Sequence, residues 1–262
     1  HNIDALRISR YPHINKLFLK LIYMAELFAC RVSDFVTVVS GTDYIIAKKL
    51  LKPRRLDIIP NFVAYEIIER TLKKRSFRRR VWYEYVVYHG DFRYFPNREA
   101  LLNMLKHIMP EIWKDYPNIK LVLIGPGIPR FEGIRIKSLG FLPQEELYAV
   151  ISGAVCAIVP LLRGGGTRIK ILEYMTCGVP VISTETGAEG LDVENFKHII
   201  LVRNVEEIPS VFKTLIGNTR LREELTRNAI ALVRNKYDAQ KVVAKLARIC
   251  ESLINQRRDP YG

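Results

Sequence analysis

Short apolar runs alternate with amphipathic stretches along most of this chain. In its larger part, runs rich in β-branched residues predict buried strands at 86–88, 119–124, 134–139, 155–159, 179–183 and 198–202. Stretches with apolar residues at helical spacing fall between several of them, at 97–116, 144–152 and 167–177. This alternation predicts an α/β fold with a doubly wound parallel sheet, whose ligand sites lie outside the carboxyl ends of the strands.

A shorter alternation of the same kind comes first in the chain. An amphipathic helix is predicted at 14–31, with one apolar stripe made of Leu17, Leu21, Met24 and Phe28. A strand at 34–39, a helix at 43–51 and a strand at 56–59 follow it, and three more helices are predicted beyond the larger part, at 205–216, 220–236 and 239–254. The strand–helix–strand order at 34–59 has the rhythm of a second parallel α/β unit.

A strongly basic segment separates the two alternating parts. Its basic residues are Lys73, Lys74, Arg75, Arg78, Arg79 and Arg80. One interpretation is a solvated linker between domains. The other is contact with acidic lipid headgroups or with a lipid-phosphate acceptor, since Trp82, Tyr83 and Tyr85 follow and could lie at a membrane interface.

The overall charge favours anionic partners. The 262 residues include 41 Lys plus Arg against 27 Asp plus Glu, which gives a net charge of +14. Phosphates, acidic lipids and nucleic acid would all suit such a surplus. Apolar residues make up 48% of the chain, which excludes a largely disordered protein. The longest mostly apolar run, 149–162, is shorter than the roughly 20 residues that cross a bilayer. We expect a cytoplasmic protein, with peripheral contact at the inner face of the membrane as an option.

The cysteines and histidines give little sign of a metal site. The four cysteines are far apart and form no C-x-x-C, which indicates reduced thiols. No pair of histidines has metal-ligand spacing, although His89 follows a predicted strand and is placed to approach the ligand edge. The first residue is His1 rather than Met, so we expect the sequence to be a piece of a longer chain.

The segment from 160 to 173, P-L-L-R-G-G-G-T-R-I-K-I-L-E, follows a predicted strand and opens a predicted helix. Its three consecutive glycines are Gly164, Gly165 and Gly166, and its cations are Arg163, Arg168 and Lys170. Glycines permit a tight turn with converging N–H groups, and a helix N-terminus adds free donors and a positive dipole end. The segment therefore predicts an anion cradle suited to a diphosphate. The alternative is a flexible surface turn with solvated arginines.

The longer stretch from Gly164 to Gly190 resembles the donor-site motif of family 4 (group 1) glycosyltransferases of the GT-B type. Further matches to this family are Ile59-Pro60-Asn61, the segment from Gly90 to Asn97, Gly140-Phe141-Leu142-Pro143, and the segment from Arg227 to Tyr237. The resemblance spans nearly the whole chain. It implies two Rossmann-like domains facing a cleft, with the second domain binding a nucleotide-diphosphate sugar.

The resemblance also implies roles for individual residues. Glu173 would accept hydrogen bonds from the ribose hydroxyls of the nucleotide, which suits a carboxylate because it can accept from two neighbouring hydroxyls. The diphosphate would be bound by main-chain N–H groups of Thr167, Arg168 and Ile169. The remaining implied donor-site residues are Phe141 and Leu142 near the base, and Gly187 and Glu189 near the sugar or the phosphates.

Catalysis would combine a histidine of the first domain with cations of the second. His1 matches the family histidine that faces the donor sugar, although a terminal histidine could equally be disordered or come from a purification tag. Arg168 and Lys170 would stabilise the leaving diphosphate. The chain departs from the family at Gly165, where many members carry a glutamate that contacts the sugar.

A second departure concerns the loop after the 86–88 strand. Many members carry Arg and Lys there, where this chain has Asp91 and Asn97. Arg93 or Arg98 could substitute, or the cations of the glycine segment could hold the phosphates.

The expected organisation is a C-terminal part of an acceptor domain (1–62), a basic linker (63–81), a donor-binding domain (82–236) and a terminal helix that crosses back (237–262). The expected reaction is retaining transfer from a UDP- or GDP-sugar to a sugar or lipid-linked acceptor, without cofactor or metal, since no D-x-D occurs. The alternatives are a GT-B-type nucleotide-sugar epimerase and a non-catalytic basic module for acidic membrane or nucleic acid. With the resemblance, no nucleic-acid partner is expected.

Overall fold

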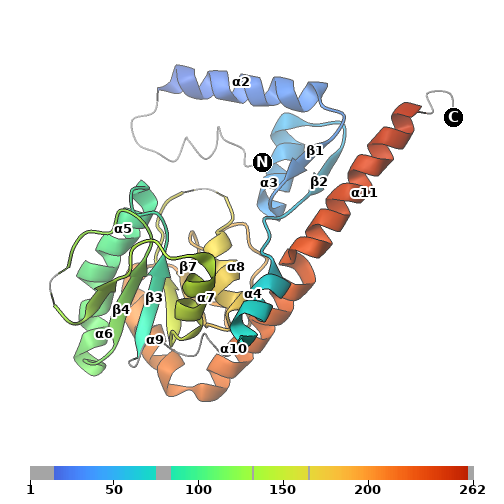
Figure 1. The fold of residues 1–262 in the computed structure, drawn as a ribbon. Coiled ribbons are helices and arrows are strands. Elements are labelled where there is room, and N and C mark those ends of the chain that lie inside the picture. Colours follow the sequence, from blue (N-terminus) through green and yellow to red (C-terminus); the bar gives the residue numbers. More distant parts are fainter. Residues whose placement is uncertain (1–14, 75–83, 132, 165, 259–262) are drawn as a thin grey trace.

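The computed structural model describes residues 15–74, 84–131, 133–164 and 166–258. Its centre is a parallel sheet of six strands in the order β5-β4-β3-β6-β7-β8 (Figure 1). The strands are β3 (Tyr85–His89), β4 (Lys120–Ile124), β5 (Ile136–Ser138), β6 (Cys156–Val159), β7 (Val181–Thr184) and β8 (Ile200–Val202). The central strands are buried on both faces, as their continuous apolar runs indicate. The predicted α/β class and parallel sheet are confirmed.

Helices cover both faces of this sheet (Figure 1). One group contains α7 (Gln144–Ser152) and α8 (Ile169–Thr176), and the other contains α5 (Phe95–Asn103), α6 (Met109–Asp115) and α9 (Ile208–Gly217). A further helix, α10 (Thr219–Leu232), contacts both α8 and α9. The strand order accounts for this division, because the chain moves outward from β3 in one direction and from β6 in the other, and parallel crossovers have one preferred hand.

The single helix predicted at 97–116 is interrupted. A π-helical turn at Met104–Ile108 separates α5 from α6. Pro110 explains the interruption, because proline has no N–H to donate to the preceding turn and its ring clashes with the carbonyl four residues earlier. Met104, Ile108 and Met109 remain fully buried, so the irregular turn still packs on the core.

A small unit precedes the sheet domain. It contains α2 (Lys16–Val32), β1 (Val36–Val38), α3 (Gly41–Ile46), a π-helical turn (Ala47–Leu51) and β2 (Leu56–Ile58), with β1 and β2 parallel. Cys30 and its neighbours at helical spacing pack on a separate core with Val38 and Leu51. The opposite stripe of α2 is exposed in this structure, at Leu17, Leu21, Met24 and Phe28.

The chain passes between the two units twice, at adjacent positions. The main-chain N–H of Val63 donates to the Tyr237 carbonyl (2.9 Å), and the N–H of Ala239 donates to the Val63 carbonyl (2.9 Å). Beyond this junction, α11 (Ala239–Arg258) runs back along the small unit (Figure 1). There the Lys245 ammonium contacts the Asp57 carboxylate at 2.7 Å.

Part of the segment predicted as a linker is a helix. Residues Tyr65–Lys73 form α4, which packs against α7 and α8. Two lysines of the basic run pair with carboxylates of this domain, Lys73 with Glu69 and Lys74 with Glu145, each at 3.0 Å. The rest of the basic run lies outside the described residues. Among the helices that the structure describes, none is long and apolar enough to cross a membrane.

Candidate functional site

The point where the strand order reverses lies between β3 and β6. From β3 the chain builds outward to β4 and β5, and from β6 it builds outward to β7 and β8. Ligands of open α/β sheets bind outside the carboxyl ends of the strands at such a point. Here β3 ends at His89 and β6 leads into the glycine segment, so this edge of the sheet is the candidate site.

The glycine segment turns sharply before α8. Gly164 and Gly166 have φ values of 109° and 81°, which side chains with a Cβ rarely adopt. A Cβ on Gly164 would lie 2.7 Å from a guanidinium nitrogen of Arg168, so this side chain packs closely over the turn. Gly165 lies outside the described residues.

The helix after these glycines begins at Ile169, two residues later than predicted. Arg168 occupies the N-cap position, and its guanidinium donates a hydrogen bond to the Gly166 carbonyl. Thr167 is buried, and its hydroxyl accepts a hydrogen bond from the Asn61 amide of the small unit. The segment that leaves the small unit therefore contacts the sheet domain at this turn.

The three cations of the segment have different surroundings. Arg163 is paired with the Glu99 carboxylate at 3.3 Å. Lys170 reaches across to the loop after β3, where its ammonium donates to the Asn97 side-chain oxygen (3.0 Å) and lies 4.3 Å from the Tyr88 ring centroid. Burial, together with the nearby Arg168 charge, lowers the pKa of Lys170 to about 7.

The loop after β3 contacts one cation of the glycine segment, Lys170. Asn97 occupies a position where many family members are expected to carry a cation. Its side chain accepts a hydrogen bond from the Lys170 ammonium and donates one to the Asp91 carbonyl at 2.8 Å. A Cβ on Gly90 would lie 2.7 Å from the Lys170 ammonium nitrogen, so a side chain there would displace the ammonium from this position. Arg93 is paired with the Asp91 carboxylate at 2.6 Å and points to solvent. In this structure the Lys170 ammonium lies against the loop, whereas the Arg93 guanidinium is paired with Asp91 and exposed.

Glu173 lies one turn into α8 and faces β3. Its Oε2 is 2.9 Å from Nε2 of His89, and its Oε1 is 3.5 Å from the Tyr148 hydroxyl. The side chains of His89 and Glu173 are only 12% and 17% exposed. Burial lowers the pKa of His89, which favours its neutral form. The position of His89 at a strand end indicated its approach to the site, but no spacing rule could predict its pairing with a residue 84 positions later.

The other predicted residues fall into two groups. Phe141 is exposed and Leu142 is partly buried, in the loop after β5. Gly187 and Glu189 follow β7, but the N–H of Gly187 donates to the Thr184 hydroxyl at 3.0 Å. A Cβ on Gly187 would lie 2.3 Å from the Ser183 hydroxyl oxygen, so this glycine serves close packing. His1 lies outside the described residues.

Main-chain hydrogen bonds join the loops that follow β3, β4 and β5. The N–H of Gly90 donates to the Ile124 carbonyl (2.9 Å), and the N–H of Gly125 donates to the Gly140 carbonyl (2.7 Å). The N–H of Phe92 donates to the Pro126 carbonyl at 2.9 Å. These bonds continue the hydrogen bonding of the sheet beyond its strands, so one edge of the candidate site has a fixed backbone.

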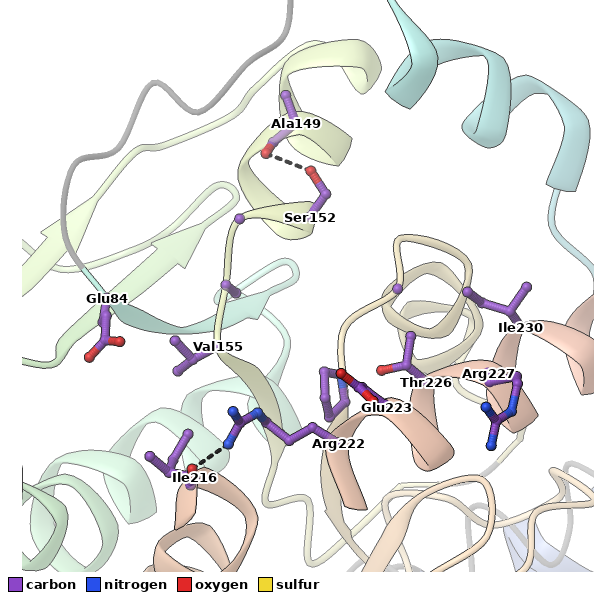
Figure 2. A pocket seen from close by; sticks show the side chains of 14 residues that line it. Glu84, Ala149, Ser152, Val155, Ile216, Arg222, Glu223, Thr226, Arg227 and Ile230 are labelled. Carbon is purple, nitrogen blue, oxygen red and sulfur yellow. Dashed lines mark hydrogen bonds between the residues drawn. The ribbon is translucent and has the colours of Figure 1, made fainter. Parts of the chain in front are cut away.

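A hollow of about 1000 Å³ lies at the opposite edge of the sheet (Figure 2). It is lined near the starts of β3 and β6 by Glu84 and Val155, and by residues of α10. One of these, Arg222, donates to the Ile216 carbonyl at the end of α9 (Figure 2). This hollow is therefore separate from the site formed by His89 and the glycine segment. Among the described residues, no three His, Cys, Asp or Glu side chains gather as a metal site would require.

Comparison with known proteins agrees with this geometry. Residues 83–218 match the model of a family described as glycosyl transferases group 1. An uncharacterised 44.6 kDa protein of the Klebsiella pneumoniae cps region is 25% identical over 62% of this chain and 44% of its own length. N-acetyl-alpha-D-glucosaminyl L-malate synthase of Bacillus anthracis is 20% identical over 99% of this chain and 68% of its own length.

Solved structures share the fold at low identity. Sucrose-phosphate synthase of Thermosynechococcus elongatus superposes with a TM-score of 0.73 at 17% identity, covering 95% of this chain and 66% of that one. Anabaena HepE in complex with UDP-glucose superposes with a TM-score of 0.68 at 16% identity, covering 92% of this chain and 69% of that one. The chain thus spans less than half of the Klebsiella relative and about two thirds of these structures. It has the GT-B fold, and it belongs to the group 1 glycosyl transferases.

Proposed function

We propose that this chain binds the donor substrate of a glycosyltransferase that moves a sugar from a UDP- or GDP-sugar to an acceptor. One observation carries the proposal. The glycine turn, the start of α8, two cations and Glu173 all converge on the reversal point of the parallel sheet. A dinucleotide, phosphate or nucleotide-sugar ligand is the usual occupant of such a position. Membership of the group 1 family favours the nucleotide sugar.

Each part of that ligand has a candidate partner. Glu173 would accept from the ribose hydroxyls, and the main-chain N–H groups of Thr167, Arg168 and Ile169 would face the diphosphate. Arg168 and Lys170 add positive charge at the same place, with Arg163 farther out and paired to Glu99. Phe141 and Leu142 would border the base, and Glu189 would approach the sugar from the loop after β7. Binding of UDP-glucose by Anabaena HepE supports a donor of this class.

The proposed reaction breaks the bond between the sugar C1 and the diphosphate and forms a bond from C1 to an acceptor oxygen, with retention at C1. The diphosphate leaves with the bonding electrons, and its departing oxygen takes the proton that the acceptor hydroxyl releases. Arg168, Lys170 and the start of α8 would stabilise the charge that develops on the leaving group, which is work that a divalent metal performs in other folds. His1, by its match to the family, would face the sugar from the other side of the cleft.

We also propose a separate role for each of the two units. The small unit before residue 63 would be the last part of an acceptor domain, and α11 would tie it to the donor domain. The acceptor would be a glycan or a lipid-linked sugar, met in the cytoplasm or at the inner face of an acidic membrane. The exposed stripe of α2 is consistent with an acceptor domain that is larger than the described small unit.

Calorimetry with UDP, GDP and their sugars, in chelator and again with magnesium, tests the proposal. We expect a nucleoside diphosphate to bind in chelator with an affinity that magnesium changes little. Binding that requires magnesium would contradict the metal-independent mechanism, and the absence of binding by either nucleotide would contradict the donor site itself.

A further inference from the structure

We propose that His89 is a positioning residue for Glu173, and that the pair makes this site prefer a ribose over a 2′-deoxyribose. The inference rests on the proposed function, since it concerns the carboxylate that would bind the nucleotide. Its evidence is the 2.9 Å contact between His89 Nε2 and Glu173 Oε2, which joins β3 to α8 at the reversal point of the sheet.

The orientation of the His89 ring is fixed from several sides. Its ring meets the Tyr174 ring edge-on, with centroids 4.9 Å apart, and its main-chain N–H donates to the Tyr174 hydroxyl at 2.8 Å. Its Nδ1 is buried and has no hydrogen-bond partner among the described residues. A neutral imidazole carries one N–H, and an ionised carboxylate can only accept. The proton therefore belongs on Nε2, where it is donated to Glu173.

This bond determines which way the carboxylate faces. An ionised carboxylate offers about four lone-pair positions, and His89 occupies one of them on Oε2. The Tyr148 hydroxyl lies 3.5 Å from Oε1 and limits rotation on the other side. The remaining lone pairs can then accept from the two neighbouring hydroxyls of a ribose at once. A 2′-deoxyribose offers only one of these donors, and a freely rotating carboxylate would distinguish the two sugars less well.

The test measures selectivity rather than affinity alone. Calorimetry compares UDP with 2′-deoxy-UDP, and GDP with 2′-deoxy-GDP, on the whole chain and on its variants. We expect the parent to prefer the ribose form by about 10-fold, the value of one hydrogen bond to a charged group. His89→Ala should reduce that preference to the level of Glu173→Ala. His89→Gln, which keeps a donor near the Nε2 position, should restore most of it.

Two controls separate positioning from folding. His107 is exposed, so His107→Ala should keep the parent selectivity. Long-range ¹H–¹⁵N spectra of the parent should show the neutral Nε2–H tautomer of His89, a signature that a purely structural histidine need not have. This measurement uses the parent protein alone, so it can be made even if the His89→Ala variant does not fold.

The outcomes are distinct. If Glu173→Ala loses the ribose preference while His89→Ala keeps it, the positioning role is overturned and the donor site stands. If Glu173→Ala keeps the full preference, the ribose assignment in the proposed function is wrong, and the role of His89 is overturned with it. An Nδ1–H tautomer in the parent would also overturn the inference.

Discussion

We expect binding at the proposed nucleotide site to depend on pH through the charge state of Lys170. Its pKa is lowered to about 7 by burial and by the nearby Arg168, although Glu173 opposes the shift. A diphosphate selects the charged ammonium, so the apparent affinity scales with the charged fraction of Lys170. That fraction falls from about one half at pH 7 to about one tenth at pH 8 and one hundredth at pH 9. We therefore expect affinity to fall by about 5-fold between pH 7 and 8, and by about 50-fold between pH 7 and 9.

The assay is calorimetry with UDP-glucose, because its diphosphate has no phosphomonoester group that titrates in this range. Measurements in buffers with different heats of ionisation should show uptake of about 0.9 proton at pH 8. Lys170→Arg keeps its charge over this pH range and should give an affinity that changes little with pH.

Loss of folding cannot imitate the decline in affinity with pH. Because the folded pKa lies below the unfolded value, this lysine makes the free energy of unfolding rise with pH from about 7 to 10.4. An equal decline in the parent and in Lys170→Arg would refute the reasoning.

Three other substitutions test separate parts of the site. Glu173→Ala should weaken UDP binding by about 1.5–3 kcal/mol. Glu194 is an exposed carboxylate paired with a lysine of its own loop, so Glu194→Ala should not change the affinity. Equal affinities for both variants would show that the ribose assignment is wrong. Arg168→Ala should weaken binding of UDP more than binding of uridine, and the difference should shrink in high salt; an equal loss for both ligands would indicate a folding defect instead. Gly187→Ala should lower the free energy of unfolding by about 1–3 kcal/mol through overpacking. Gly217→Ala should not lower it, because a Cβ there would meet no neighbouring atom. Equal unfolding free energies for the two variants in denaturant would contradict the packing argument.

Local pattern predicted the elements well because each depends on nearby residues. The buried strands were visible as short β-branched runs, and the predicted helices at 144–152 and 239–254 correspond to α7 and α11. The start of α8 was missed by two residues, because Thr167 is held by a side chain of the small unit, 106 positions earlier. The single helix predicted at 97–116 lacks the observed π-helical turn, although Pro110 is visible in the sequence.

The candidate site was predictable as a set of residues but not as a set of contacts. The glycine segment and Glu173 could be recognised from their order along the chain. The contact of Lys170 with Asn97 and the pairing of Glu173 with His89 each join residues more than 70 positions apart. Such pairs arise only when β3 and β6 become neighbours, and no spacing within either segment carries that information. The pKa of Lys170 is likewise a property of the assembled site.

The hydrogen-bonded loops after β3, β4 and β5 have a consequence for the thermodynamics of any ligand at this edge. A Cβ on Gly125 would lie 1.9 Å from the Gly90 carbonyl oxygen, so these two backbones are in direct contact and neither can shift alone. The ordering entropy of this edge is therefore spent when the protein folds rather than when a ligand arrives. Ligands that differ only in the group facing these loops should bind with similar entropies, and their affinities should separate through enthalpy.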